Sequence, residues 1–265
     1  MSSFIDTPLG YKIHYKLSGD PSGQLVILTH GLCGSTATFD NFVPLLPERF
    51  HAVSVDFPGF GKSPRPSAAD PLRQRAAPAP ASPCSSWDTR WAPLSIYTLL
   101  LPLPPHLPLA ASCFWDPAAR AAMVDLAALV RAQGIAAAAT KAAEVTNFYA
   151  DTPERTVPAL LRRSVYDAVA ASDPEAYAQT CEAMVADDHV DPAYGAITCP
   201  VVFVAGDKDR ISPVTRSEDL AKLVGGPVEV QVVRSGHQLI LEDSEGVKLA
   251  LSIFLSHVEK VEAEA

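Results

Sequence analysis

The sequence predicts an α/β fold in which helices flank a mostly parallel β-sheet. Strand-like and helix-like segments alternate at both ends of the chain, as expected of parallel strands joined by right-handed crossovers. The segment Leu25–Leu28 is continuously apolar, which is typical of a strand buried on both faces of a parallel sheet. With 265 residues, 48% of them apolar and 19% charged, the chain is long and apolar enough to bury the core of such a domain.

The individual elements follow from residue types and their spacing. β-Branched and aromatic residues bounded by turn residues predict strands over 11–17, 24–29, 51–55, 201–205 and 228–233. Apolar residues at helical spacing predict helices over 39–46, 213–224 and 244–257. From 117 to about 185 the pattern is helical, with breaks at Gly134, Pro153, Pro158 and Pro174. We expect these last helices to form an insertion that lies over the sheet.

The middle of the chain, from about 68 to 116, departs from this pattern. Eleven of the 24 prolines lie within 64–108, and no glycine occurs within 62–133. A parallel-sheet domain needs at least one strand and one helix here, but proline at this density disfavours both. The five prolines within 93–108 also argue against a membrane-spanning helix. One interpretation of this segment is a Pro-rich disordered insertion.

The composition excludes several classes of protein. A net charge of −9 argues against a nucleic-acid partner, because such proteins need a basic surface to neutralise phosphates. The cysteines are odd in number and lack a C-x-x-C spacing, which predicts reduced thiols: Cys33, Cys84, Cys113, Cys181 and Cys199. The first 25 residues carry charges and no apolar stretch, so no secretory signal is expected. Together these features predict a cytoplasmic protein with no membrane partner, and they leave the oligomeric state open.

The first candidate site lies where the apolar strand ends, at His30-Gly31-Leu32-Cys33-Gly34. A glycine-bearing turn at a strand end exposes backbone N–H groups, and such fixed donors stabilise the negative charge that develops during acyl transfer. The alternative is an ordinary strand-to-helix turn. Because no base is placed to ionise Cys33, we interpret this residue as a small buried filler and not as a nucleophile.

A second turn follows the strand predicted over 51–55. Residues 56–63 read Asp-Phe-Pro-Gly-Phe-Gly-Lys-Ser, and the last three are also found in phosphate-binding loops. Such a loop needs another glycine five positions before Gly61, where this chain has Asp56. Nucleotide binding is therefore not expected.

An acid and a base follow two successive strands near the C-terminus. Asp207 and Asp209 come after the strand predicted over 201–205, and His237 follows the strand over 228–233. A carboxylate and a histidine in these positions can meet in space, and the carboxylate then fixes the imidazole tautomer and stabilises its protonated form. A lone Asp or His is usually part of a solvated turn, but the order and spacing of this pair favour a functional role.

Taken in order, these three motifs resemble the α/β-hydrolase superfamily. The resemblance implies the α/β-hydrolase fold, with a helical lid over a mostly parallel sheet, and it makes the turn 56–63 structural. It divides the chain into a core of 1–67 and 191–265 and a helical lid of 117–190. The segment 68–116 would contain the central elbow strand, which we expect to be missing or disordered.

The resemblance also assigns chemical roles. The oxyanion hole would include Gly31 and Leu32, with the N–H of Leu32 as the donor. The family pattern Gly-x-x-Asp selects Asp209 over Asp207 as the acid, and the base would be His237. The implied activity is serine-hydrolase-type cleavage of a small-molecule carboxylic ester or lactone. No metal and no organic cofactor is needed for it.

Parts of the predicted lid resemble the 3-oxoadipate enol-lactonase group, in which a helical lid covers a small carboxylated lactone. The matching stretches are Ala118–Met123, Val130–Gly134, Asp173–Tyr177 and Cys181–Ala183. Four arginines of the lid are candidates to contact a substrate carboxylate, with exposed helix faces as the alternative: Arg120, Arg131, Arg162 and Arg163.

Other polar clusters carry less information. Four further histidines lie in predicted strands, in the Pro-rich segment or on the polar side of the last helix: His14, His51, His106 and His257. The acidic loop Asp187-Asp188-His189 with Asp191 contains metal-ligating residue types, but adjacent residues on one loop rarely converge on an ion. We interpret this loop as a solvated turn.

The family's nucleophile is absent from the chain as written. The fold needs a serine on a sharp Gly-x-Ser-x-Gly elbow, some 25–35 residues after Ser63 by family resemblance. No such motif occurs among the 265 residues, and the serines of the region lack flanking glycines: Ser85, Ser86, Ser95 and Ser112. The chain as written is therefore expected to be almost inactive, and a catalytically inactive binding protein is the alternative function.

The genetic code offers a reason for this absence. When the codons of Ser86–Ala92 are read from their third base, the last G of Trp87 joins the GA of Asp88 to give glycine. The last G of Trp91 joins the GC of Ala92 to give a second glycine. The codons between them allow the reading Gly-His-Ser-Met-Gly, which is an elbow at the expected place.

The same shift converts Cys113–Pro117 into an apolar run ending in glycine, which resembles the buried strand after the elbow helix. We therefore hypothesise that residues 68–116 are the elbow region translated out of frame. If Arg90 uses a CG codon, the shifted nucleophile position cannot encode Asp or Cys. This disfavours the dehalogenase and epoxide-hydrolase branches, which use Asp.

Overall fold

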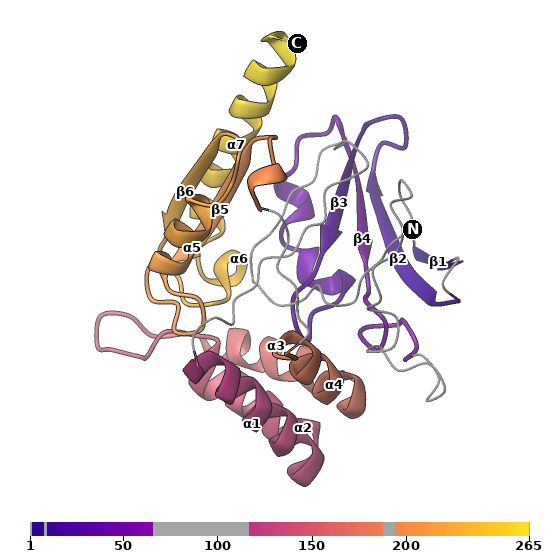
Figure 1. Cartoon of the computed structure of the whole chain (residues 1–265), viewed down its shortest axis with the longest axis vertical. Coiled ribbons are helices and arrows are strands. Elements are labelled where there is room, and N and C mark those ends of the chain that lie inside the picture. Colours follow the sequence, from indigo (N-terminus) through magenta and orange to yellow (C-terminus); the bar gives the residue numbers. More distant parts are fainter. Residues whose placement is uncertain (1, 8–9, 66–116, 188–193, 265) are drawn as a thin grey trace.

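The computed structural model of the chain describes residues 2–7, 10–65, 117–187 and 194–264. Figure 1 shows a four-stranded sheet formed by the N-terminal part and a two-stranded sheet with its helices formed by the C-terminal part. A group of helices lies across one end of both sheets. The predicted α/β class is confirmed. The predictions made for 68–116, including the missing or disordered elbow strand, lie outside the described residues.

The four-stranded sheet has the order β1-β2-β4-β3. Its strands are β1 (Ser2–Asp6), β2 (Lys12–Gly19), β3 (Gln24–Thr29) and β4 (Phe50–Val55). The pairs β1–β2 and β2–β4 are antiparallel, while β3 and β4 are parallel, with Leu28 opposite Ser54. The strand predicted over 24–29 is confirmed at both ends. Because β3 and β4 run in the same direction, the turns that follow them meet at one edge of the sheet.

The segment between β3 and β4 corrects the helix predicted over 39–46. It forms two short 3₁₀ turns instead, Thr36–Phe39 and Val43–Leu45. Pro44 has no backbone N–H to donate, and Pro47 follows two residues after the second turn ends, so the segment cannot form a continuous α-helix. The apolar residues Phe39 and Phe42 are nevertheless buried, as their spacing indicates.

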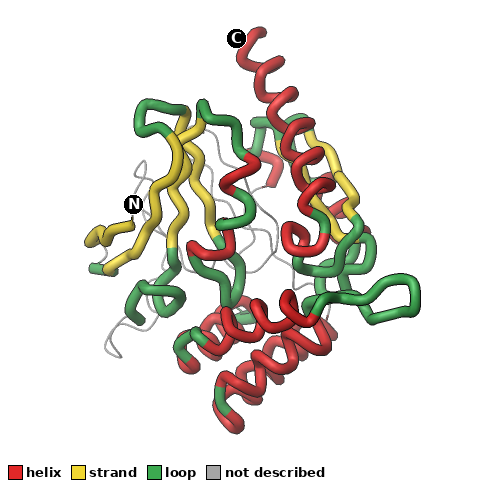
Figure 2. Tube along the Cα trace, turned by 180° about the vertical axis from the view of Figure 1, so that it is seen from behind, coloured by secondary structure: helices red, strands yellow, loops and turns green. Residues whose placement is uncertain are grey.

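The C-terminal part contains the parallel pair β5 (Val201–Gly206) and β6 (Val228–Val233). Helix α5 (Val214–Ala221) connects them, and α6 (Leu239–Glu242) and α7 (Ser244–Glu264) follow. Figure 2 shows α7 running along this sheet and projecting beyond it at the C-terminal end. The carboxyl ends of β5 and β6 point toward the same group of helices as the carboxyl end of β3 (Figure 1).

We call this helical group the lid helices, after the role that the sequence predicts for it. It consists of α1 (Pro117–Gln133), α2 (Ile135–Lys141), the π-helical turn Ala142–Thr146, α3 (Ala159–Ala170) and α4 (Pro174–Met184). Gly134 separates the first two helices with a φ of 82°, a conformation that favours glycine. Pro158 and Pro174 stand at the starts of α3 and α4, as the breaks in the sequence predict.

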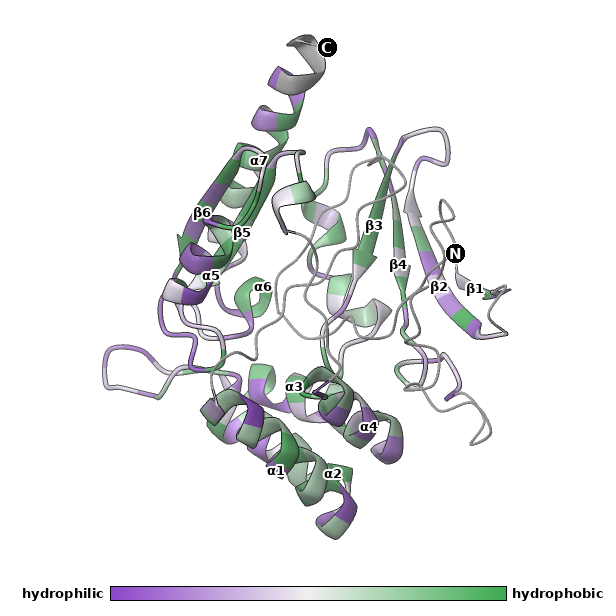
Figure 3. Cartoon of the chain, in the orientation of Figure 1, coloured by the Kyte–Doolittle hydropathy of each residue, from purple (hydrophilic) through white to green (hydrophobic). Residues whose placement is uncertain are grey.

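Two hydrophobic clusters hold these parts together. The first joins Val26 and Leu28 of β3 to Val204 of β5 and Leu251 of α7, so residues from both sheets share one core. Figure 3 shows the corresponding hydrophobic colouring along β3 and β5. The second cluster is built mainly by the lid helices, and Leu32 from the turn after β3 and Leu241 from α6 pack against it. Among the described residues, no helix has the length and apolar character to cross a bilayer.

Candidate active site

The turn after β5 fixes the carboxylate of Asp209. Its Oδ1 atom accepts the backbone N–H groups of Ile211 at 2.8 Å and Ser212 at 2.9 Å. These bonds close a tight turn of the kind that aspartate side chains form with their own backbone. The second oxygen, Oδ2, remains available for a partner outside the turn, and its direction is set by the first two bonds.

That partner is His237. Its Nδ1 atom lies 2.8 Å from Oδ2 of Asp209, and the two side chains are 12% and 5% exposed, respectively. An ionised carboxylate only accepts hydrogen bonds, so Nδ1 of the neutral imidazole carries the proton and Nε2 keeps its lone pair. In this arrangement the ring can act as a base through Nε2. The two residues selected by the sequence for acid and base are thus brought into contact.

Asp207, the alternative acid, has a different partner. Its carboxylate accepts from Nη1 of Arg155 at 3.2 Å and 3.3 Å. The Arg155 guanidinium also stacks on Tyr149, 3.8 Å from the ring centroid. Asp207 therefore ties the turn after β5 to the segment that follows the π-helical turn, while Asp209 engages the histidine.

The loop that carries His237 also contacts the lid helices. The backbone N–H of His237 donates to the carbonyl oxygen of Asn147 at 3.0 Å. Asn147 directly follows the π-helical turn Ala142–Thr146, and such turns are frequent at functional sites. A Cβ atom on Gly236 would lie 2.7 Å from the backbone nitrogen of Tyr149, so glycine is required for this close approach. The candidate base is thus held by two parts of the chain.

The proposed oxyanion turn lies at the carboxyl end of β3. It is closed by a hydrogen bond from Gly34 N–H to the carbonyl oxygen of Gly31, at 3.0 Å. Cys33 has a φ of 59°, a left-handed conformation that is unusual for a residue with a side chain. Leu32 packs against the lid cluster, as does Leu241 beyond His237. The turn and the histidine loop therefore face the same helices.

Cys33 is not suited to be a nucleophile. Burial raises the pKa of its thiol to about 12, and its sulfur contacts the buried phenol of Tyr177. A thiol with this pKa carries almost no thiolate at neutral pH, and the thiolate is the nucleophilic form. Cys33 is partly buried and packs against the lid cluster, so the structure supports its interpretation as a small filler but does not bury it fully.

The side chain of His30 contacts the proposed oxyanion turn and the turn after β4, a role that the sequence analysis did not assign. Its Nδ1 atom lies 2.7 Å from the carbonyl oxygen of Gly31, and its Nε2 atom accepts the N–H of Phe57 at 3.0 Å. Burial lowers the pKa of the His30 imidazole. A histidine immediately before the glycine turn was the available signal, but nothing in the sequence identifies Phe57 as its partner.

The turn after β4 has a structural role, as the family resemblance implies. The buried carboxylate of Asp56 accepts from Nδ1 of His14 at 2.7 Å, from Lys62 N–H at 2.9 Å and from Thr36 N–H. Gly61 has a φ of 55°, and a Cβ there would lie 2.3 Å from the Asp56 carboxylate. Asp56 therefore connects β2, the turn 56–63 and the first 3₁₀ turn after β3.

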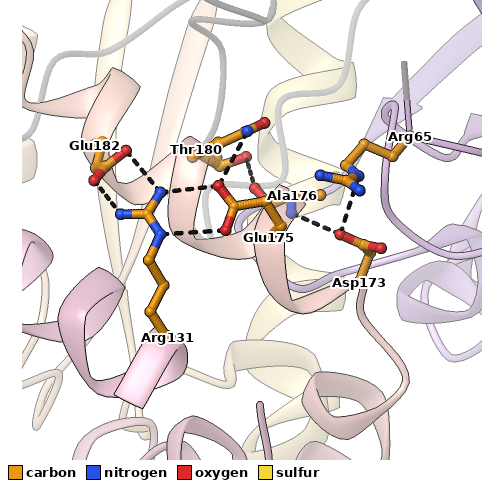
Figure 4. Close-up of polar contacts among 8 residues, drawn as sticks. Arg65, Arg131, Asp173, Glu175, Ala176, Thr180 and Glu182 are labelled. Carbon is orange, nitrogen blue, oxygen red and sulfur yellow. Dashed lines mark hydrogen bonds and ion pairs between the residues drawn. The ribbon is translucent and has the colours of Figure 1, made fainter. Parts of the chain in front are cut away.

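The four lid arginines all have acidic partners. Figure 4 shows Arg131 of α1 between Glu175 and Glu182 of α4. The remaining three also form ion pairs with acids: Arg120 with Asp187, Arg162 with Asp151, and Arg163 with Asp167. These pairings favour a structural role for each arginine over the capture of a substrate carboxylate.

The acidic loop near 187–191 lies mostly outside the described residues. Within the described part of the chain, no group of three or more His, Cys, Asp or Glu side chains is arranged to hold a metal ion.

Comparisons with known proteins bear on the fold of the chain. Residues 24–91 match a family described as the alpha/beta hydrolase fold. The chain also resembles the probable oxidoreductase EphD of Mycobacterium tuberculosis, with 42% identity over 71 residues. That match covers 26% of this chain and spans only 12% of the relative's length.

Two further likenesses extend over nearly the whole chain. The (R)-3-hydroxydecanoyl-ACP:CoA transacylase of Pseudomonas putida is 25% identical over 256 residues, which cover 91% of this chain and 85% of the relative. The crystal structure of the enol-lactonase from Burkholderia xenovorans superposes with a TM-score of 0.69 and 18% identity, covering 96% of this chain and 100% of that one. The chain has the α/β-hydrolase fold.

Proposed function

We propose that this chain derives from a hydrolase that cleaves a carboxylic ester or lactone, in the manner of an enol-lactonase, by serine-type catalysis. The observation that carries the proposal is the 2.8 Å contact between Nδ1 of His237 and Oδ2 of Asp209, at the carboxyl ends of two parallel strands. The fold shared with an enol-lactonase and the extended likeness to a transacylase support acyl chemistry. The substrate we propose is a small molecule.

The proposed reaction begins with a serine hydroxyl that attacks the substrate carbonyl while Nε2 of His237 accepts its proton. Asp209 stabilises the imidazolium, and backbone donors that include the N–H of Leu32, next to Gly31, stabilise the oxyanion. Collapse of the intermediate transfers the proton from His237 to the leaving alkoxide and leaves an acyl-serine. A water molecule, deprotonated by His237, then attacks the acyl-serine and releases the acid and the regenerated serine. No metal or organic cofactor enters this scheme.

The serine of this scheme belongs to the shifted reading frame of Ser86–Ala92, which lies outside the described residues. We propose that the ancestral frame encodes Gly-His-Ser-Met-Gly there. The chain as written lacks this elbow. Loss of a triad nucleophile commonly lowers the rate by about a million-fold, so we expect the chain as written to be almost inactive.

Two experiments test the proposal. Sequencing the transcript across codons 60–120 determines whether the reading frame is continuous for the residues as written. The chain as written and a frame-restored chain are then assayed on a short acyl ester and on an enol-lactone. Hydrolysis by the restored chain alone supports the proposal, and no hydrolysis of either substrate by a correctly folded restored chain would contradict it.

A binding protein without catalysis is the second candidate function. Two observations favour it: the absence of a Gly-x-Ser-x-Gly motif, and a hydrophobic core shared by β3, β5 and α7 that preserves the scaffold. Saturable binding of an enol-lactone by the chain as written, without turnover, would support this alternative. A transcript that encodes the written residues without interruption would favour it further.

We also propose the division into a core of 1–67 and 191–265 and a lid of 117–190. We propose that the protein is located in a reducing compartment such as the cytoplasm. The three described cysteines are free thiols: Cys33, Cys181 and Cys199.

A further inference from the structure

We propose that Glu242 is a positioning residue for His237. Its carboxylate, at the end of α6, holds the loop that presents the imidazole to Asp209. The inference rests on the proposed function, in which His237 is the catalytic base. It adds a residue that neither the motif analysis nor the family resemblance identified.

Glu242 accepts hydrogen bonds from the residues on both sides of His237 in the sequence. Its Oε2 atom accepts the backbone N–H of Gly236 at 3.0 Å and that of Gln238 at 3.2 Å. These are the residues immediately before and after His237. Because both flanking peptides are fixed to one oxygen, the Cα–Cβ bond of His237 has a defined direction toward Asp209.

Every backbone N–H from 234 to 238 has an acceptor. Arg234 donates to the Asp243 carboxylate at 2.8 Å, Ser235 to the carbonyl of Val233 at 3.0 Å, and His237 to the carbonyl of Asn147. Glu242 supplies the acceptor for the other two. Its removal would leave two partly buried donors without a partner, which a folded loop avoids by moving.

Glu242 contacts the loop as a hydrogen-bond acceptor, since Oε2 takes both N–H groups and Oε1 is buried without a hydrogen-bond partner in the described part of the chain. Burial raises the pKa of its carboxyl, while the N–H donors of Gly236 and Gln238 and the charge of Arg155 lower it. The negative charge of Asp209 raises the pKa of the Glu242 carboxyl. A glutamine has the same length and keeps a carbonyl oxygen for both N–H groups, so it should preserve the loop.

The first test observes His237 directly and does not need turnover. The full chain is labelled with ¹⁵N-histidine, and the downfield Nδ1–H resonance of His237 is assigned by its loss in His237→Gln. Glu242→Gln should keep this resonance at its parent position. Glu242→Asp, which is too short to reach both N–H groups, and Glu242→Ala should shift or abolish it. The exposed Glu245, substituted by Gln, is the matched control and should change nothing.

The outcomes of this test are decisive in both directions. A folded Glu242→Ala chain with the parent resonance would overturn the proposal. Loss of the resonance in Glu242→Gln would also overturn it, because charge and not the acceptor would then be responsible. If Glu242→Ala does not fold, the comparison of Gln with Asp at this position gives the answer.

The second test uses the frame-restored chain. We expect Glu242→Ala to lower kcat by about 100-fold, because a base misplaced by about 1 Å costs roughly that much, while KM stays within about twofold. Glu242→Gln should restore kcat to within a factor of about three of the parent. An inactive restored parent would refute the proposed function but leave the resonance experiment valid. An active parent matched by Glu242→Ala would refute the positioning role alone.

Discussion

The imidazole of His30 accepts the backbone N–H of Phe57 through Nε2 at 3.0 Å while its Nδ1 faces the carbonyl oxygen of Gly31 at 2.7 Å. Only the neutral tautomer with the proton on Nδ1 satisfies both contacts. Protonation of Nε2 would remove the acceptor for Phe57 and place a charge in a buried site. Burial lowers the pKa of the His30 imidazole, against the Gly31 carbonyl and the charge of Asp56, which raise it. The loss of the Phe57 contact on protonation acts in the same direction as burial.

The first prediction concerns stability and pH. An unfolded histidine has a pKa of about 6.5, and the folded value for His30 is lower, so the unfolded chain binds the extra proton first. His30 should therefore destabilise the fold as the pH falls below about 6.5, by up to about 1.4 kcal/mol per pH unit. Urea unfolding of the parent and of His30→Gln at pH 7.5, 6.5 and 5.5 measures the difference.

The control for this experiment is His257→Gln in α7, a partly exposed histidine whose Nε2 lies 3.6 Å from a carboxylate oxygen of Glu229. It should keep the parent's pH dependence. Equal pH slopes for the parent and His30→Gln would show that His30 does not contribute.

The second prediction concerns Gly34. A Cβ atom at this position would lie 2.6 Å from Cβ and 2.9 Å from Cγ of His30, so Gly34→Ala forces the oxyanion turn or the ring to move. We expect a loss of about 1–3 kcal/mol in the free energy of unfolding, as for other overpacked sites. Gly195→Ala is the control, because a Cβ atom there would have the backbone oxygen of Leu223 as its nearest neighbour, at 3.9 Å. Equal stability of the two variants would contradict the prediction.

The third prediction separates the two aspartates after β5. In the frame-restored chain, Asp209→Asn should lower kcat by about 10⁴-fold, because an amide no longer stabilises the His237 imidazolium or its tautomer. Asp207→Asn should cost less than about 10-fold, because its partner is Arg155. Steady-state kinetics on a short acyl ester measures both. A larger effect at Asp207 would show that the acid has been assigned to the wrong residue.

The fourth prediction concerns Arg131, whose side chain is 42% exposed. Arg131→Gln should lower the free energy of unfolding by less than about 1 kcal/mol, because exposed ion pairs contribute little. The KM of the restored chain for a carboxylated lactone should stay the same, since Glu175 and Glu182 already engage the guanidinium. A KM increase confined to carboxylated substrates would instead show that Arg131 binds them.

Much of the fold could be predicted because strands and helices leave periodic patterns. The strands at 24–29 and 228–233 agree with the structure at both ends. The strand β1 could not be predicted, because its apolar residues Phe4 and Ile5 are half exposed and it is held by backbone pairing with β2. The helix predicted over 39–46 was wrong because apolar spacing alone does not show that Pro44 lacks a backbone N–H to donate.

The candidate site shows the same division. Side chains that do chemistry are recognisable by type and spacing, and Asp209 and His237 do come together. The residues that hold them bond to or through backbone groups: the Glu242 carboxylate accepts two loop N–H groups, and Asn147 offers its backbone carbonyl. A backbone carbonyl or N–H leaves no signature in a sequence. Glu242 and Asn147 could therefore be identified only from coordinates.

The hydrogen bond from His237 to the carbonyl of Asn147 has a mechanical consequence. If the helical cap swings outward to admit a molecule, this tether is stretched, and the imidazole loses one of its anchors at the moment of entry. The imidazole would recover its orientation only when the helices return and this hydrogen bond forms again. Entry of a molecule and proton transfer by the histidine would then occur in different conformations of the chain.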